Sequence, residues 1–157
     1  MLLIGINTQG LRCTTRWLTA FNFLKWLQCD IIFLQETHWT AELENTINSQ
    51  LTGQIIYNYG SENSCGVAIL LHEKTDNQIT QPKRDSHGRI IATKITLDDQ
   101  EINLVNVYAP RTNSEQHSFS RSLRNYLTND DNNTSGGDFN SIADPQRDKS
   151  SGNANAR

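Results

Sequence analysis

Long hydrophobic runs and metal-binding cysteine pairs are both missing from this sequence. No stretch reaches the roughly 18 consecutive apolar residues that a membrane-spanning helix needs, so no association with a membrane is predicted. The three cysteines, at positions 13, 29 and 65, form no Cys-x-x-Cys pair, which argues against a zinc site and against a disulfide framework. This cysteine usage fits a reducing, intracellular compartment, and no targeting signal is recognisable.

Positive charge is also scarce. The 14 lysines and arginines are outnumbered by 17 aspartates and glutamates, which gives a net charge of −3. A protein that bound only the phosphate backbone of a nucleic acid would usually be basic. Carboxylates that hold a divalent cation would shift the balance the other way, so the net charge leaves a nucleic-acid partner open.

The length and composition predict one domain followed by a polar tail. A chain of 157 residues is typical of a single domain with its own hydrophobic core. Residues 1–149 are predicted to form this domain. Residues 150–157 are small and polar, which is typical of a disordered tail.

Apolar patterns predict alternating strands and helices around a hairpin-rich centre. Strands are expected at residues 2–6, 31–34, 55–57, 67–71, 89–97 and 102–107. Helices are expected after a cap at Thr14 or Thr15, from Thr40, and over residues 115–127. Residues 128–135 are polar and are expected to form a loop, with a turn at Gly136-Gly137. This order predicts an α/β fold, a four-layer α/β sandwich in which two packed mixed sheets carry flanking helices.

Polar residues with catalytic chemistry follow several of these strands. They are Asn7, Glu36, Tyr108, Asp138 and Asn140. Taken singly, each is more often an ordinary rim or turn residue. Together they offer what phosphodiester hydrolysis requires: a carboxylate for Mg²⁺, a neutral oxygen donor beside it, a base for water, and donors for the phosphate. Loops at strand ends are also where active sites are usually found.

Six segments, in order along the chain, carry a more specific pattern. They are Asn7-x-x-Gly10-Leu11-Arg12, Phe33-Leu34-Gln35-Glu36-Thr37-His38, Cys65–Leu70, Asp85-x-x-Gly88-Arg89, Asn106-Val107-Tyr108-Ala109-Pro110 and Gly137-Asp138-Phe139-Asn140. Their order and spacing resemble the endonuclease/exonuclease/phosphatase superfamily, and in particular the DNA-nicking endonucleases of non-LTR retrotransposons. The resemblance runs from about Leu3 to Asp148, which is nearly the whole chain.

The resemblance implies a phosphodiesterase that nicks DNA with Mg²⁺, for which Mn²⁺ can substitute. By that resemblance, Glu36 and Asn7 form the metal site, Tyr108 and Asn140 contact the scissile phosphate, and Asp138 orients the attacking water. Contacts with the DNA backbone are expected from Arg12, Arg111 and Arg147, although exposed arginines are more often simply solvated. His38 is expected to pack beside the metal motif. No membrane and no obligate protein partner are expected, and a retrotransposon endonuclease would act in the nucleus.

Three features depart from the family pattern. Gln9 stands where relatives in base-excision repair carry an aspartate. Residues 128–135 are polar where the family has an apolar buried strand. The chain also stops before the family's Ser-Asp-His motif, whose histidine faces the phosphate, so the fold is expected to be incomplete at the carboxyl end.

These departures leave alternatives open. The chain is a DNA-nicking endonuclease, with cleavage at abasic sites as a variant, or it is an inactive fragment or decayed copy that lacks the terminal Asp-His motif. A third reading keeps the fold but acts as a phosphatase on a lipid or nucleotide phosphoester. The sequence does not distinguish target preference or oligomeric state.

Overall fold

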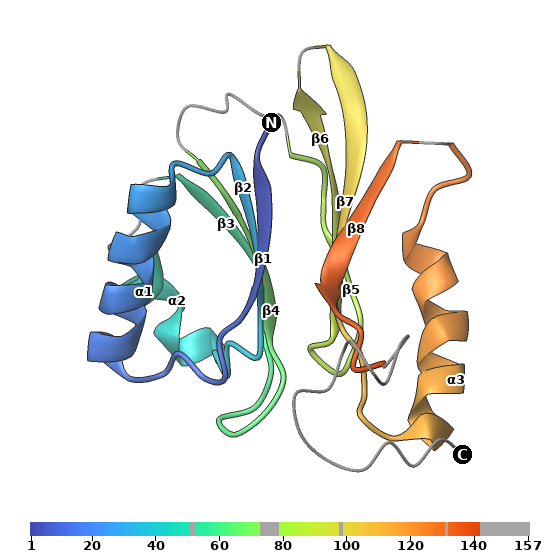
Figure 1. Ribbon diagram of the computed structural model, residues 1–157, viewed down its shortest axis with the longest axis horizontal. Helices are drawn as coiled ribbons and strands as arrows, with labels where there is room; N and C mark the ends of the chain where they lie inside the picture. Colours follow the sequence, from blue (N-terminus) through green and yellow to red (C-terminus); the bar gives the residue numbers. More distant parts are fainter. Residues whose placement is uncertain (51–52, 73–78, 98, 131, 142–157) are drawn as a thin grey trace, which may run out of the picture.

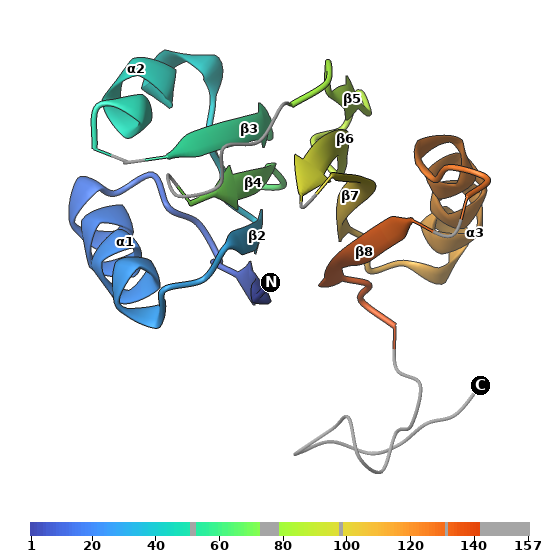
Figure 2. The ribbon, with the colours of Figure 1, turned by 90° about the horizontal axis from the view of Figure 1, so that it is seen from above.

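Two β-sheets lie face to face, with helices on their outer surfaces (Figures 1 and 2). The structure is a computed structural model that describes residues 1–50, 53–72, 79–97, 99–130 and 132–141. The predicted polar tail, residues 150–157, lies outside these described residues. Within the described part of the chain, no helix is long and apolar enough to cross a membrane.

The first sheet has the strand order β1-β2-β4-β3. Its strands are β1 (Leu3–Asn7), β2 (Ile31–Gln35), β3 (Gln54–Asn58) and β4 (Val67–Leu71). β1 and β2 are parallel, whereas β4 runs antiparallel to both of its neighbours. Every residue of β2 and β4 is buried, which explains why these central strands read as nearly continuous apolar runs.

The second sheet has the order β5-β6-β7-β8. Its strands are β5 (Lys83–Arg84), β6 (Ile90–Leu97), β7 (Gln100–Tyr108) and β8 (Asn133–Asp138). The antiparallel pair β6–β7 is the predicted hairpin, and β7 and β8 are parallel. Both sheets are therefore mixed, as predicted.

Helices cover the outer face of each sheet (Figure 2). They are α1 (Thr14–Leu27), α2 (Glu44–Asn48) after a 3-10 turn at Ala41–Leu43, and α3 (Asn113–Leu123), which continues as a 3-10 turn at Arg124–Tyr126. α1 and α2 pack on the first sheet, and α3 packs on the second. The predicted cap at Thr14 or Thr15 is wrong, because the helix begins at Thr14 and Cys13 is its N-cap residue.

Three apolar clusters hold the four layers together. Trp17, Phe21 and Trp39 belong to the cluster between the first sheet and its helices. Phe33 and Leu104, both fully buried, belong to the cluster between the two sheets. The third cluster packs β6 and β7 against α3. The predicted four-layer α/β sandwich is confirmed.

The expected loop over residues 128–135 and the expected Gly136-Gly137 turn are partly wrong. Strand β8 begins at Asn133 and includes both glycines. Polar residues can form this strand because it lies at the edge of the described sheet and its side chains are only partly buried or exposed. No fully buried apolar face is required of it, so the cost that a polar central strand would carry does not arise.

Candidate active site

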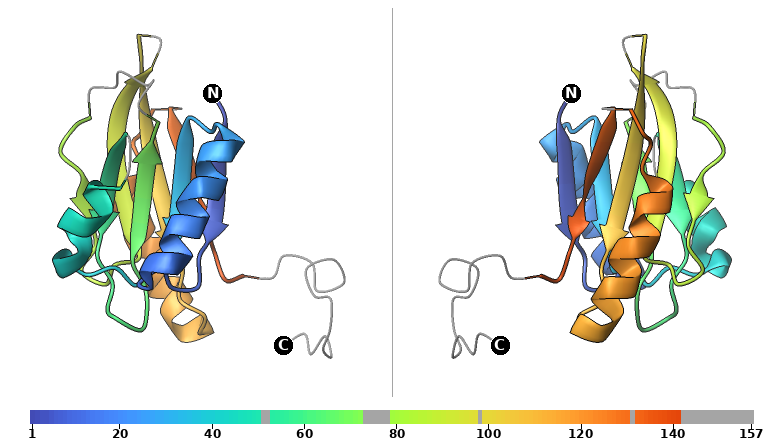
Figure 3. Two further views of the ribbon diagram at one scale, coloured as in Figure 1. Left: turned by 90° about the vertical axis from the view of Figure 1, so that its left-hand side faces the viewer. Right: turned by 90° about the vertical axis from the view of Figure 1, so that its right-hand side faces the viewer.

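The carboxyl ends of four strands lie together at one end of the sandwich. β1 ends at Asn7, β7 ends at Tyr108 and β8 ends at Asp138, while Glu36 directly follows β2. β1 and β8 belong to different sheets, yet they run side by side in the same direction (Figure 3). This arrangement places the ends of both sheets together and brings the predicted site residues into one cluster.

Asn7 links the two carboxylates of this cluster. Its Nδ2 donates a hydrogen bond to Glu36 Oε1 at 3.2 Å and another to Asp138 Oδ2 at 2.8 Å. Its Oδ1 accepts the backbone N–H of Gln9 at 3.0 Å. The amide therefore turns its nitrogen, and not its oxygen, toward the carboxylates. This geometry makes Asn7 a residue that orients Glu36 and Asp138.

Glu36 adopts a backbone conformation that side chains rarely take. Its φ is +51°, in the left-handed region. A conformation of this kind costs about 1–2 kcal/mol and is held by its surroundings. The carbonyl of Glu36 accepts hydrogen bonds from Gly10 N at 2.7 Å and from Thr8 Oγ1 at 3.0 Å. The loop after β1 thus fixes the direction of the Glu36 side chain.

The Glu36 carboxylate is only 10% exposed and is surrounded by donors. Arg111 Nη2 lies 3.0 Å from Oε1, and His38 Nε2 lies 3.8 Å from Oε2. Burial alone would raise the pKa of Glu36. Hydrogen bonds from Tyr108 and Asn7 and the positive charge of Arg111 outweigh burial, so that the pKa of Glu36 is lowered. The carboxylate is therefore ionised at neutral pH and ready to attract a cation.

Tyr108 is positioned by Arg89, a residue whose role the sequence did not reveal. Arg89 Nη1 donates to the Tyr108 carbonyl at 3.3 Å, and the guanidinium carbon lies 5.3 Å from the centre of the Tyr108 ring. Burial, followed by the hydrogen bond with Glu36, raises the pKa of Tyr108. The phenol consequently stays protonated at neutral pH and can donate a hydrogen bond. The Asp85-x-x-Gly88-Arg89 motif forms the turn that carries Arg89, since Asp85 Oδ1 accepts the backbone N–H of Arg89 at 2.8 Å.

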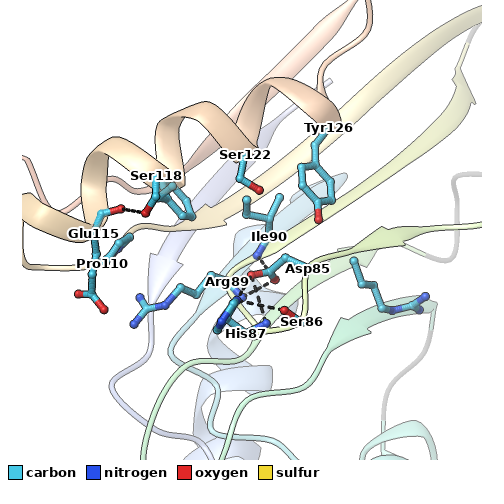
Figure 4. Close-up of a pocket in the computed structure, with 12 residues that line it drawn as sticks. Asp85, Ser86, His87, Arg89, Ile90, Pro110, Glu115, Ser118, Ser122 and Tyr126 are labelled. Atoms are coloured by element: carbon cyan, nitrogen blue, oxygen red, sulfur yellow. Dashed lines mark hydrogen bonds and ion pairs between the residues drawn. The ribbon is translucent and has the colours of Figure 1, made fainter.

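A cavity of about 380 Å³ lies between α3 and this turn (Figure 4). Asp85, Arg89, Pro110 and Tyr126 are among the residues that line it. Arg89 both lines this cavity and contacts Tyr108.

Asp138 and Asn140 are fixed by hydrogen bonds to each other, to Ala109 and to Gln116 on α3. Asp138 Oδ1 accepts the backbone N–H of Asn140 at 2.9 Å. Asn140 Nδ2 donates to the Ala109 carbonyl at 2.7 Å, and Gln116 Nε2 on α3 donates to the Asn140 carbonyl at 2.9 Å. The Asp138 carboxylate keeps unused acceptor capacity, because each of its oxygens has two lone pairs. It can therefore accept a proton or a hydrogen bond from a water molecule.

Gly137 allows β8 to lie close enough to β7 for this contact. Its φ is +137°, and a Cβ atom there would lie 2.0 Å from the Val107 carbonyl oxygen. No side chain can be accommodated at that distance. The register Tyr108–Asp138 depends on this close approach.

A buried amide pair lies directly beneath the cluster. Gln35 Nε2 donates to Asn106 Oδ1 at 2.7 Å, and Asn106 Nδ2 donates to the carbonyls of Leu34 and Ala68 at 2.9 and 2.8 Å. Gln35 is 2% exposed and Asn106 is fully buried. These hydrogen bonds join the two sheets immediately below the site, and the sequence pattern gave no indication of them.

The two remaining predicted arginines are not part of the cluster. Arg12 Nη1 forms an ion pair with Glu62 Oε2 at 2.9 Å on the surface. Arg147 lies outside the described residues. The predicted contacts of both with DNA stay predictions, as do the catalytic roles of the clustered residues.

With the geometry established, similarity to known proteins identifies the family. The model of the Endonuclease/Exonuclease/phosphatase family matches residues 6–153, and a Xenopus laevis protein named "Transposon TX1 uncharacterized 149 kDa protein" is 33% identical over 142 residues. The chain belongs to the endonuclease/exonuclease/phosphatase family. The matched segment covers 88% of this chain and 11% of the Xenopus protein. The resemblance to retrotransposon members of the family is thereby confirmed.

Solved structures share the endonuclease/exonuclease/phosphatase fold. An AP endonuclease from Archaeoglobus fulgidus has a TM-score of 0.70 at 20% identity, and covers 92% of this chain and 60% of its own. TDP2 from D. rerio, complexed with single strand DNA product, has a TM-score of 0.65 at 17% identity, and covers 89% of this chain and 60% of its own. An AP endonuclease from Leishmania major has a TM-score of 0.63 at 19% identity, and the match covers 79% of this chain and 46% of the Leishmania chain.

The residues of the cluster fit a hard divalent ion such as Mg²⁺ or Mn²⁺ better than Zn²⁺. Among the described residues, no group of three or more His, Cys, Asp and Glu side chains could hold a metal ion. Zinc would need such a group, whereas Mg²⁺ is commonly held by one or two carboxylates together with waters and substrate oxygens. Glu36 provides a hard-oxygen side chain for such an ion, and Asn7 holds the Asp138 carboxylate beside it.

Proposed function

We propose that this chain is a magnesium-dependent phosphodiesterase that nicks DNA. The observation that carries the proposal is the Glu36–Asn7–Asp138 network, in which residues 131 positions apart in sequence meet at the joined ends of two sheets. A purely structural role would not require two carboxylates to lie so near each other. Both are held by one amide, with Tyr108 hydrogen-bonded to Glu36.

Each residue of the network has a step to perform. Glu36 would hold the metal ion, which would supply positive charge against the charge that develops on the phosphate oxygens. Asn7 keeps the Glu36 and Asp138 carboxylates aligned, and Asp138 accepts a proton from the attacking water. Tyr108 stays protonated at neutral pH, and its single O–H would turn from Glu36 to a phosphate oxygen when the substrate binds. Asn140 Nδ2 has a second N–H, not used by the Ala109 carbonyl, that can also donate to the phosphate.

The identity of the substrate rests on the relatives. The transposon-encoded Xenopus protein is the most similar in sequence among those described above, and the solved structures include AP endonucleases and a TDP2 bound to DNA product. A nuclease encoded by a transposon would act on chromosomal DNA, so we infer a nuclear place of action. Arg111 and Arg12 are exposed cations that can contact the DNA backbone.

The test compares variants on three substrates. Nicking of supercoiled plasmid in the presence of Mg²⁺ is expected to fall by about 10²–10⁴-fold in Glu36→Gln and in Asp138→Asn, and to stop when the metal is chelated. Glu42→Gln, which removes an exposed carboxylate from the first 3-10 turn, is the matched control and should nick as the parent does. Duplex DNA with an abasic site and a chromogenic phosphomonoester complete the set.

The outcomes separate the alternatives. Faster cleavage at the abasic site would specify the abasic variant of the same activity. Turnover of the phosphomonoester without nicking would replace the nuclease by a phosphatase. Nicking that persists unchanged in both Glu36→Gln and Asp138→Asn would show that the cluster is not the active site.

A further inference from the structure

The carboxylate that we assign to the metal ion is already covered by a guanidinium group. Arg111 Nη2 and Asn7 Nδ2 both donate to the same oxygen of Glu36, Oε1, at 3.0 and 3.2 Å. The two charged side chains differ in exposure, since that of Arg111 is 72% exposed and that of Glu36 is 10% exposed. An exposed cation therefore closes over a largely buried anion.

Electrostatics explains why Arg111 takes this place. A buried carboxylate without a counterion is costly, and the guanidinium supplies the missing positive charge. A divalent ion held by Glu36 would supply twice the positive charge of the guanidinium. A cation at Oε1 would compete with Arg111 for that oxygen, and a cation at the second oxygen, Oε2, would still repel the guanidinium hydrogen-bonded to its neighbour.

We propose that Arg111 is the resident counterion of Glu36, that a divalent metal ion displaces it, and that the released guanidinium then binds a phosphate of the substrate. The proposal rests on the proposed function, because it requires the metal to bind at Glu36. Displacement is favourable because the metal ion would replace the positive charge beside Glu36, while the exposed Arg111 side chain remains in contact with solvent. The fork of N–H groups on arginine matches the oxygens of a phosphate.

Arg111 is placed for this exchange by the chain on either side of it. It follows Pro110 in the connection between β7 and α3, where the Pro110 carbonyl is held by Gln116 Nε2 at 3.1 Å. Its neighbour Tyr108 is a proposed phosphate donor and is hydrogen-bonded to Glu36. The guanidinium released from Glu36 would therefore remain beside the position of the scissile phosphate. Metal binding and phosphate binding would thus be coupled through one side chain.

The first experiment measures the affinity of Mn²⁺ alone by titration calorimetry. Arg111→Ala should bind Mn²⁺ about two- to fivefold more tightly than the parent, because the competing cation is gone. Arg121→Ala removes the same charge from the exposed last turn of α3 and should leave the affinity unchanged. Glu36→Gln should lose the binding.

Failure of each proposal gives a different result. Unchanged or weaker Mn²⁺ binding in Arg111→Ala, with binding abolished in Glu36→Gln, would overturn the counterion role and leave the metal site standing. Equal tightening in Arg111→Ala and Arg121→Ala would also overturn it, because net charge alone would explain the gain. Undiminished Mn²⁺ binding in Glu36→Gln would overturn the metal site and the displacement of Arg111 together.

The second experiment measures the phosphate contact without cleavage. In an Asp138→Asn background, binding of a short DNA duplex is followed by fluorescence anisotropy over a range of salt concentrations, with Mn²⁺ or with EDTA. The logarithm of the binding constant falls linearly with the logarithm of the salt concentration. With Mn²⁺, Arg111→Ala should make this slope shallower by about 0.9, the value expected for the loss of one phosphate contact. With EDTA the same substitution should change the slope little, because Arg111 is then still engaged by Glu36. An equal reduction under both conditions would contradict the exchange.

Discussion

Two polar networks begin at neighbouring residues, Gln35 and Glu36, and differ in nearly every other respect. Gln35 points between the sheets, where its Nε2 donates a hydrogen bond to Asn106 Oδ1. Asn106 Nδ2 in turn donates to two strand carbonyls. Glu36 lies just beyond the strand end, where it shares Oε1 between Asn7 and an exposed arginine. The buried network is neutral and self-contained, while the rim network carries charge that a ligand can use. A satisfied buried network stabilises a unique core, and a charged rim network is suited to binding.

Substituting Asn106 should produce the largest change in stability. Asn106→Leu removes the acceptor of the Gln35 amide and both donors to strand carbonyls, so buried polar groups lose their partners. We expect the free energy of unfolding to fall by about 2–4 kcal/mol, measured by urea denaturation. Asn7→Ala, at the rim, should lower it by less than about 1 kcal/mol and should instead reduce nicking. Equal losses of stability in the two variants would remove the distinction between the networks.

A glycine substitution tests how tightly the second sheet positions the rim network. In Gly137→Ala the new Cβ would lie 2.0 Å from the Val107 carbonyl oxygen, so β8 must shift and carry Asp138 with it. We expect a loss of about 1–3 kcal/mol in thermal unfolding, together with weaker nicking. Gly5→Ala is the matched control, because no atom lies within 4 Å of the corresponding Cβ in β1. A neutral Gly137→Ala would show that the approach of β8 to β7 is not required.

Acid should act on the rim network and spare the buried one. The pKa of Glu36 lies below its ordinary value of 4.5, so its ionised form contributes stability that is fully present above pH 4.5. This contribution is lost as the pH falls through the lowered pKa of the folded state. The stability difference between the parent and Glu36→Gln should therefore shrink on acidification, when unfolding is measured over a pH series. Asn106→Leu, which changes no titratable group, should keep the pH profile of the parent, and a changed profile would show that the two networks are coupled.

The elements with apolar patterns were predictable, and the reasons are physical. Strands β2 and β4 and the last six residues of β7 are buried and therefore consist largely of apolar residues. The positions of Asn7, Glu36 and Tyr108 at strand ends followed directly from those patterns. Convergence of the five site residues depended on the family resemblance, since spacing alone does not specify which strands become neighbours.

Three features could not be read from the sequence. β8 has the composition of a loop, Asn-Thr-Ser-Gly-Gly-Asp, and is a strand because it pairs along β7 at the sheet edge. The ion pair between Arg111 and Glu36 joins residues 75 positions apart, and the buried pair of Gln35 and Asn106 joins residues 71 apart. Contacts of this kind arise from the packing of two sheets, for which no local pattern of residues exists.

Each sheet is assembled from one continuous half of the chain, the first from residues 3–71 and the second from residues 83–138. During folding, most strand pairings within a half can therefore form over modest sequence separations, which are rapid to close. The Asn7–Asp138 hydrogen bond spans 131 positions and requires both halves to be complete and docked. The proposed catalytic cluster should accordingly be among the last parts to form. A nascent chain whose strand β8 has not yet emerged from the ribosome would lack the Asn7–Asp138 hydrogen bond, and with it the complete cluster.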